Sequence, residues 1–260
     1  MSLRKRSETD RAPSVTQCQH WVHTLVPTSG TLPIAATRAV VVFGPVSTVY
    51  DCALPVRRAA GLTAAAGALR ARQLVVLPTD TVYGVGCDAF SPTAVQRLLD
   101  AKGRGRDMPV PVLVGSWSTV DGVALSVPPR ARMLIEAFWP GGLSLVLFHA
   151  PSLTWDLGDT RGTVMVRMPL HPVALELLRE VGPMAVSSAN RSGAVPATTV
   201  EQAREQLAER VEVYLDGGKA GGTASTIVDL TGEDPVVLRE GAVSAAQIGE
   251  VLGLPIEVAR

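Results

Sequence analysis

The pattern of apolar and polar positions predicts strands that alternate with helices along most of the chain. Short, continuous runs rich in valine and leucine that end at a proline, a glycine or a polar residue are typical of buried strands. Such runs occupy residues 74–77, 110–114, 143–148, 163–167, 184–187, 211–215, 226–230 and 236–239. Stretches with apolar residues at helical spacing occupy residues 55–71, 120–125, 128–138, 171–181, 200–210 and 244–252. Because the two types are mixed throughout, without an internal repeat or a clear linker, we expect one α/β domain with a mixed sheet.

The stretch from residue 74 to residue 114 combines this pattern with side chains that can carry chemistry. Pro78 ends the first strand, because proline cannot donate to a sheet ladder, and we expect a polar loop in which Gly84 and Gly86 free the backbone. Ser91 and Pro92 are typical of a helix N-terminus, with Ser91 as the N-cap. A cationic turn with interspersed glycines follows this helix: Lys102, Arg104 and Arg106.

This frame suits a polyanionic ligand, because arginine forms bidentate bonds with phosphate or carboxylate and glycine lets the backbone come close. The alternative is a solvated basic turn, since cations also favour the C-terminal end of a helix. This stretch alone leaves both interpretations open.

Several other predicted strands also end in polar loops. Such loops begin at Arg167, Ser187 and Ser225, and Arg239 lies one hairpin away from the last. Ligands of open α/β sheets gather at strand ends, so these loops could converge on one cleft. Taken singly, each loop is more simply explained as a turn or a helix cap. The sequence contains no P-loop, dinucleotide-binding glycine motif, zinc-protease motif or serine-hydrolase elbow.

Length, charge and cysteine content narrow the class of protein. The 260 residues allow one large domain or two small ones, and the net charge of zero argues against binding nucleic acid through bulk charge. The three cysteines, Cys18, Cys52 and Cys87, form no CxxC pair, which favours reduced cytosolic thiols over a zinc site or a disulfide framework. No apolar run approaches the ~20 residues that a membrane-spanning helix needs.

The first 48 residues differ from the rest. They contain a basic LRKR sequence, several Ser and Thr, and one apolar run at residues 39–43, without the apolar core and cleavage site of a targeting peptide. Three interpretations remain open: a disordered extension, a small added element, or upstream sequence translated from a misplaced start. We favour the misplaced start, with Val46 or Val49 as the initiator, and place the main domain at residues 49–260.

Taken together and in order, five motifs resemble the YrdC/Sua5 family between about Leu74 and Gly241. These motifs are PTDTVYGVG, KGRGRDMP, VRMPLHP, SSANRSG and STIVDL…LREG. The resemblance implies a single YrdC-like domain at residues 49–260, with a twisted mixed sheet, flanking helices and a concave ligand cleft. It also implies a nucleotidyltransferase that makes L-threonylcarbamoyladenylate and pyrophosphate from L-threonine, bicarbonate and ATP.

The resemblance extends to cofactor, partners and location. Mg²⁺ would accompany ATP, and no metal ligands from the protein are expected. The protein would be cytoplasmic, without a membrane partner. Its product would pass to the tRNA threonylcarbamoyl transferase complex for N6-threonylcarbamoyladenosine synthesis, with tRNA contacted indirectly.

The resemblance assigns roles to individual residues as well. The catalytic cations would be Lys102 and Arg104 of the KxR motif, which would hold phosphate and carboxylate charge. L-threonine would be bound by Thr81, Arg167, Ser188 and Ser225. ATP would be bound by Lys102 and Arg104 together with Thr163, Asn190, Thr198 and Arg239.

Five positions depart from the common pattern of the family. They are Asp80 in place of Glu, Gly105 in place of Pro, Met108 in place of Asn, Leu113 in place of His, and Ala224 in place of Pro. We assign no substrate role to Met108 or Leu113, because both lose a polar contact. Asp80 is a candidate general base by its place in the sequence only.

Two other functions stay open. The first is a non-catalytic RNA-binding module of the same fold, based on a basic cluster that lacks interleaved aromatic residues: Arg97, Lys102, Arg104 and Arg106. The second is a different carbamoyl-adenylate enzyme, as in larger carbamoyltransferases that contain a related domain.

Overall fold

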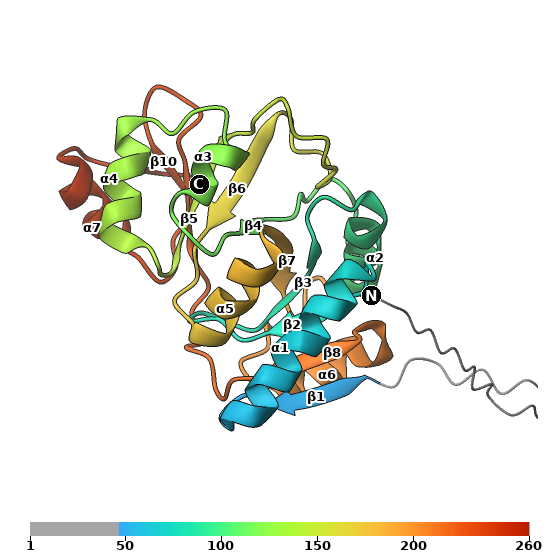
Figure 1. Cartoon of the computed structure of the whole chain (residues 1–260). Coiled ribbons are helices and arrows are strands. Elements are labelled where there is room, and N and C mark those ends of the chain that lie inside the picture. Colours follow the sequence, from blue (N-terminus) through green and yellow to red (C-terminus); the bar gives the residue numbers. More distant parts are fainter. Residues whose placement is uncertain (1–46, 260) are drawn as a thin grey trace, which may run out of the picture. The chain divides into compact units, whose positions relative to one another are not determined.

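The computed structural model describes residues 47–259 of the chain (Figure 1). Its strands are β1 (Thr48–Asp51), β2 (Val75–Leu77), β3 (Gly84–Asp88), β4 (Val112–Leu113), β5 (Leu143–Phe148), β6 (Thr163–Arg167), β7 (Met184–Ser188), β8 (Val213–Asp216), β9 (Thr226–Asp229), β10 (Val236–Arg239) and β11 (Glu257–Val258). Its helices are α1 (Pro55–Arg70), α2 (Pro92–Lys102), α3 (Thr119–Val123), α4 (Pro129–Phe138), α5 (Pro172–Val181), α6 (Val200–Leu207) and α7 (Ala245–Leu252), with a short 3₁₀ turn at Ala208–Arg210. The expected α/β domain with a mixed sheet and flanking helices is confirmed.

Within the described residues the strands form one sheet in the order β1-β8-β2-β3-β7-β4-β6-β5-β9-β10-β11. The sheet contains both parallel and antiparallel pairs: β4 runs parallel to β6, for example, whereas β5 runs antiparallel to β6 and parallel to β9. Strands far apart in the sequence therefore end side by side, and the loops that follow them come together.

The helices cover the two faces of this sheet unequally. Helices α2, α3, α4, α6 and α7 contribute to one apolar cluster, whereas among the described helices only α1 and α5 contribute to the second. Helices α1 and α5 lie side by side over β8, β2 and β7 (Figure 1). The same face of β4, β6, β5 and β9 lies beyond α5 and forms the floor of a pocket described below.

The local signals for the central helix act as the sequence predicts. The Ser91 hydroxyl accepts a hydrogen bond from Ala94 N at 3.4 Å, and Pro92 occupies the first turn of α2. Gly103 ends the helix with a φ of 62°, a left-handed conformation that glycine adopts without strain.

Strand β3 shows that one prediction was wrong. Gly84 and Gly86 belong to a strand that pairs antiparallel with β2 and β7, and not to a flexible loop. Packing explains the glycines, because a Cβ atom on Gly84 would lie 2.6 Å from Val186 Cγ1 and one on Gly86 would lie 2.7 Å from Val186 Cγ2. The absence of side chains on one face of β3 makes room for Val186.

Smaller differences concern strand ends. The strand expected at residues 110–114 is reduced to β4, and it begins late because Pro109 and Pro111, which both precede β4, cannot donate backbone hydrogen bonds. The sequence did not predict β1 and β11, the two edge strands. Thr48 of the expected extension lies in β1, whereas residues 1–46, with the apolar run at residues 39–43, lie outside the described residues.

Among the described helices, none is long and apolar enough to cross a membrane.

Candidate active site

A pocket of about 390 Å³ lies against the part of the sheet that extends beyond α5. Its floor consists of apolar side chains from four strands: Leu113 of β4, Met165 of β6, Val186 of β7 and Ile227 of β9. Its polar lining comes from all five of the predicted loops: Thr79, Thr81, Arg104, Arg167, Ser187, Ser188, Ser225 and Arg239. Among the described residues that line it, three are arginines and none is acidic, so the pocket suits an anionic ligand.

Arg167 is the most firmly held of the three arginines. Its Nη2 donates to Asp80 Oδ1 at 2.5 Å, its Nη1 to Thr81 Oγ1 at 2.9 Å, and its Nε to the Gly141 carbonyl at 2.8 Å. The Asp80 oxygen also accepts Leu170 N at 2.9 Å. The three hydrogen bonds fix the guanidinium in a single orientation at the pocket wall. Burial lowers the pKa of Arg167, and the Asp80 carboxylate opposes that shift.

The second arginine, Arg239, joins the β9–β10 hairpin to the loop before β9. Its Nη2 donates to the Ser225 carbonyl at 2.7 Å and to the Ser225 hydroxyl at 3.2 Å. The same hydroxyl accepts a hydrogen bond from Ser144 Oγ at 3.0 Å. The sequence assigned no role to Ser144, although its alternation with apolar neighbours in the strand could have placed it on the face of Arg167.

The third arginine, Arg104, has few partners. Its Nη1 lies 3.4 Å from Ser187 Oγ, and its Nε is buried without a hydrogen-bond partner among the described residues. Burial lowers the pKa of this guanidinium. A buried donor without an acceptor is costly, and an anion in the pocket would satisfy it.

Lys102 lies behind the pocket and is not among the residues that line it. Its side chain is 1% exposed, and its ammonium donates to the Ser188 carbonyl at 2.5 Å and to the Asn190 carbonyl at 2.7 Å. Burial, with a smaller effect of Arg104, lowers the Lys102 pKa to about 7. The buried Asn190 amide donates to two carbonyls of its own loop, those of Arg191 and Ala194.

Two predicted ATP ligands also lie outside the pocket lining. Thr163 begins β6 on the same face as Met165 and Arg167, and its hydroxyl donates to the Thr160 carbonyl at 2.7 Å. Thr198 bonds to Gln202 through its hydroxyl, and its carbonyl accepts Ala220 N at 2.8 Å. The structure thus brings Thr81, Arg104, Arg167, Ser188, Ser225 and Arg239 together in the pocket lining, whereas Lys102, Asn190, Thr163 and Thr198 are not part of that lining.

The loop at residues 217–222 is hydrogen-bonded to the loop that carries Thr81. Gly222 N donates to the Thr81 carbonyl at 2.7 Å. The buried Tyr83 hydroxyl donates to the Gly218 carbonyl at 2.6 Å and accepts Gly217 N at 3.1 Å. These bonds connect the segment before Ser225 with the loop that carries Thr81.

Three of the departures from the family pattern line the pocket. Met108, Leu113 and Ala224 replace residues that are usually Asn, His and Pro, and each contributes an apolar or small surface. The sequence analysis assigned no substrate-binding role to Met108 or Leu113. As part of the lining they instead reduce the space available to water.

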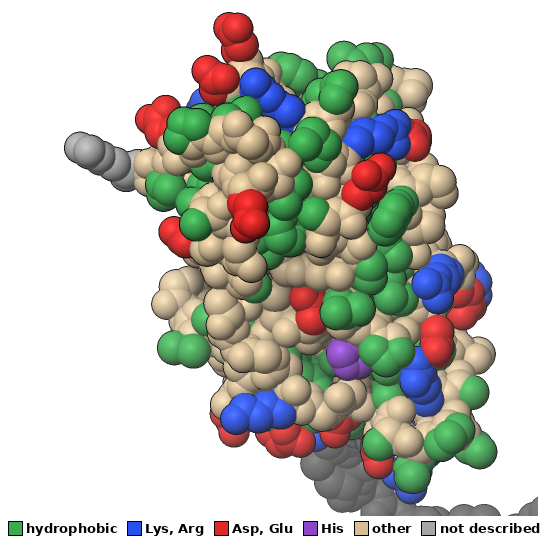
Figure 2. Space-filling model, turned by 90° about the vertical axis from the view of Figure 1, so that its left-hand side faces the viewer, with side chains coloured by type: hydrophobic (Ala, Val, Ile, Leu, Met, Phe, Trp, Pro, Cys, Tyr) green, Lys and Arg blue, Asp and Glu red, His purple; other side chains and the backbone are tan. Residues whose placement is uncertain are grey.

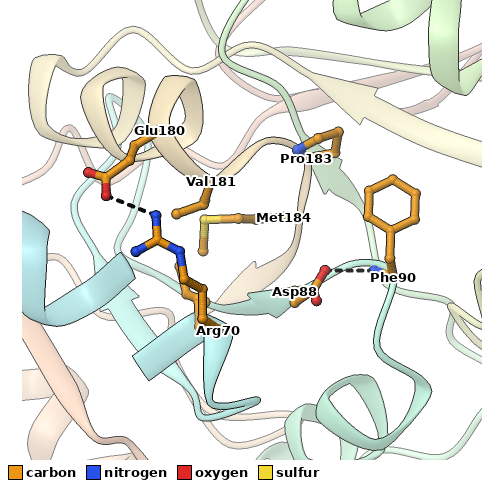
Figure 3. A pocket seen from close by; sticks show the side chains of 8 residues that line it. Arg70, Asp88, Phe90, Glu180, Val181, Pro183 and Met184 are labelled. Atoms are coloured by element: carbon orange, nitrogen blue, oxygen red, sulfur yellow. Dashed lines mark hydrogen bonds and ion pairs between the residues drawn. The ribbon is translucent and has the colours of Figure 1, made fainter. Parts of the chain in front are cut away.

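A second pocket, of about 320 Å³, lies between the C-terminal ends of α1 and α5 (Figure 3). The exposed ion pair between Arg70 and Glu180 spans it at 3.2 Å, and Asp88 accepts the backbone N–H of Phe90. Each charged group that lines it thus has a partner within the protein, and no predicted site residue lines it. The arginine-lined pocket is therefore the candidate active site.

A model of the Sua5/YciO/YrdC family, described as "Telomere recombination", matches residues 67–241. The chain belongs to this family. A Mycobacterium tuberculosis protein, to which the name threonylcarbamoyl-AMP synthase is provisionally given, is 65% identical over 206 residues, which cover 79% of this chain and 95% of that protein. The Bacillus subtilis threonylcarbamoyl-AMP synthase is 40% identical over 197 residues, which cover 75% of this chain and 57% of that protein.

Solved structures agree with this membership. The structure of Pyrococcus abyssi Sua5 complexed with L-threonine has a TM-score of 0.73 and 38% identity, and the match covers 76% of this chain and 58% of that one. The family resemblance of the five motifs is confirmed, and the fold that it implied, a mixed sheet with flanking helices, is the observed one.

Proposed function

We propose that this chain is a threonylcarbamoyl-AMP synthase, a nucleotidyltransferase that converts L-threonine, bicarbonate and ATP into L-threonylcarbamoyladenylate and pyrophosphate. The observation that carries the proposal is the pocket that the five family motifs form with three arginines and a row of hydroxyls in its wall. Family membership and the names of the relatives support it.

The substrates are assigned to opposite parts of the pocket. The carboxylate of L-threonine pairs with Arg167, whose fixed guanidinium suits a carboxylate, and hydroxyls of Thr81, Ser188 and Ser225 bind its polar groups. The phosphates of ATP take the free donors of Arg104, with Arg239 near them. Asn190, Thr163 and Thr198 are assigned to ATP through the family resemblance alone, since none of them belongs to the pocket lining.

The chemistry requires no covalent bond to the protein. The threonine amine attacks the carbon of bicarbonate or of CO₂, a nitrogen–carbon bond forms, and a proton leaves the nitrogen, with water released when bicarbonate is the donor. A carbamate oxygen then attacks the α-phosphorus of ATP, the bond to the bridging oxygen breaks, and pyrophosphate leaves. Negative charge accumulates on phosphates and carboxylates, and the three arginines stabilise it without reorganisation. The apolar floor limits water, which would hydrolyse the product.

We propose that Mg²⁺ enters with ATP. Among the described residues, no group of three His, Cys, Asp or Glu side chains could hold a metal ion. We assign the ion to the phosphate oxygens of ATP, because Mg²⁺ is commonly bound through substrate phosphates. When bound, Mg²⁺ neutralises phosphate charge. Asp80 is not assigned as a general base, because its carboxylate already accepts hydrogen bonds from Arg167 and Leu170.

The partner proposed for the product is a tRNA threonylcarbamoyl transferase complex. The product is a mixed anhydride of a carbamic and a phosphoric acid, so an acceptor must take its carbamoyl group soon after release. Direct RNA binding by this chain has less support, because the basic cluster is dispersed: Arg97 bonds to Gln73, Arg106 pairs with Asp156, and Lys102 is buried. The face shown in Figure 2 likewise mixes acidic, basic and apolar side chains.

One assay tests the proposal against both alternatives. Purified protein with ATP and Mg²⁺ should release pyrophosphate only when both L-threonine and bicarbonate are present. RNA binding without turnover would favour the binding module, and pyrophosphate release with carbamoyl phosphate in place of threonine would favour a different carbamoyl-adenylate enzyme. Absence of threonine-dependent turnover would contradict the proposal.

A further inference from the structure

Lys102 is a buried cation without a carboxylate partner among the described residues. It ends α2 with a side chain that is 1% exposed. The charged side chains on the neighbouring elements do not neutralise its positive charge. Arg104 is also positive, and Asp100 accepts a hydrogen bond from Gln96. Arg191 is positive as well and donates to the Gln206 carbonyl. Burial of such a charge is unfavourable unless other polar groups satisfy it.

Oxygen atoms of the loop from Ser188 to Ser192 accept the hydrogen bonds of the Lys102 ammonium. The three N–H groups of the ammonium have three acceptors: Ser188 O at 2.5 Å, Asn190 O at 2.7 Å and Asn190 Oδ1 at 3.4 Å. The backbone completes the attachment, because Ser192 N donates to the Lys102 carbonyl at 2.8 Å. The end of α2 is therefore bonded to both ends of this loop.

The loop in turn shapes the pocket wall. Ser187 and Ser188 line the pocket, whereas Lys102 does not. Because its three donors are used on the far side of the wall, Lys102 has none left to offer a substrate.

We propose that Lys102 is a positioning residue that holds the Ser188–Ser192 loop against the pocket, and that it does not touch the phosphates of ATP. The proposal rests on the proposed function, since it concerns the wall of the same site. It separates the two cations of the KxR motif: Arg104 faces the ligand and Lys102 fixes the loop.

A double-mutant cycle tests the proposal through binding of L-threonine. Lys102→Gln and Ser188→Ala should each raise the Kd for L-threonine by about 10-fold or more, because a displaced loop and a missing hydroxyl remove the same contact. The double variant should be little worse than either single variant. The Kd for a non-hydrolysable ATP analogue should rise by a smaller factor than the Kd for L-threonine, because Asn190, which Lys102 also holds, is only one of the residues assigned to ATP. Arg97→Gln, which removes an exposed cation from the same helix, is the matched control and should bind both ligands like the unaltered protein.

The opposite pattern would overturn the proposal. A Lys102→Gln variant that loses the ATP analogue but keeps threonine would show direct contact with phosphate. Threonine losses that multiply in the double variant would show that Lys102 does not act through the Ser188 loop. If unaltered protein releases no pyrophosphate, the proposed function fails instead, and the cycle in threonine binding still decides the role of Lys102.

A second measurement needs no variant, in case Lys102→Gln does not fold. The chain contains only three lysines, Lys5, Lys102 and Lys219, so amine acetylation can be mapped by mass spectrometry without ambiguity. Lys219 is exposed and should react. Lys102 should stay unmodified in native protein with or without the ATP analogue. Reaction of Lys102 in the free protein that the analogue suppresses would show that it faces the ligand.

Discussion

The guanidinium of Arg167 and the carboxylate of Asp80 form a buried ion pair, with 2.5 Å between Arg167 Nη2 and Asp80 Oδ1. Only 8% of the Arg167 side chain and 19% of the Asp80 side chain are exposed. The pair connects the loop after β2 with the end of β6, so it fixes the geometry of two walls of the pocket together.

Asp80→Asn should weaken the binding of L-threonine without abolishing folding. The amide keeps an oxygen for Leu170 N but removes the charge that orients Arg167, and we expect a loss of about 10-fold in affinity, measured by calorimetry. Asp80→Glu, which restores the residue usual in the family, should retain most of the affinity. Asp88→Asn at the far end of β3 is the control. Unchanged affinity in Asp80→Asn would show that Arg167 needs no carboxylate to hold its place.

Arg104→Ala should lower pyrophosphate release by about 100-fold or more, because it removes the guanidinium with the most donors free for phosphate. Arg106→Ala is the matched control from the same loop, since Arg106 is exposed and pairs with Asp156 at 2.5 Å. We expect the control to keep its rate. Equal rates for all three proteins would remove Arg104 from the active site.

Local sequence features, such as helix caps and the residues that end strands, predicted much of this fold. Ser91, Pro92 and Gly103 mark the ends of α2 because caps and left-handed turns depend on local chemistry. The strand-end loops were predicted for the same reason. Their convergence was inferred because ligands of open α/β sheets gather at strand ends, and the order of strands in the sheet brings it about.

The direction of individual side chains was harder to predict. A KxR motif places two cations near each other but does not say that Lys102 turns inward to carbonyl groups while Arg104 lines the pocket. Gly84 and Gly86 resemble loop residues in sequence, and only the position of Val186 on a distant strand explains them. Met165 could have been found, since it lies two residues before Arg167 and therefore on the same face of β6.

Gly84→Ala should destabilise the protein, because the new methyl group would lie 2.6 Å from Val186 Cγ1 at the centre of the sheet. We expect a loss of ~1–3 kcal/mol in the free energy of unfolding, measured with urea. Val186→Ala in the same chain should recover part of that loss by removing the clashing methyl groups. Failure of the second change to restore any stability would mean that backbone conformation, and not this contact, requires the glycine.

Tyr83→Phe should loosen the loop at residues 217–222. The Tyr83 hydroxyl bonds to Gly218 O and Gly217 N, and its loss leaves both backbone groups without that partner. We expect faster hydrogen–deuterium exchange in this loop and a loss of ~1–2 kcal/mol in stability. Tyr214→Phe, whose hydroxyl donates to the Ala208 carbonyl, is the control and should leave exchange in the loop unchanged.

The buried ammonium of Lys102 should make stability depend on pH in a definite direction. Burial lowers the Lys102 pKa from 10.5 in the unfolded chain to about 7 in the folded one. Between these values the unfolded chain binds a proton that the folded protein lacks, so the free energy of unfolding should rise with pH, by at most ~1.4 kcal/mol per pH unit. Below about pH 7 both states are charged at this site and the contribution is constant. Urea unfolding of unaltered protein and of Lys102→Gln should be compared from pH 7 to about pH 9. The difference between the two curves isolates this effect, because the other titratable groups are the same in both proteins and their contributions cancel. Parallel curves for the two proteins would show that the Lys102 pKa is the same in the folded and the unfolded chain.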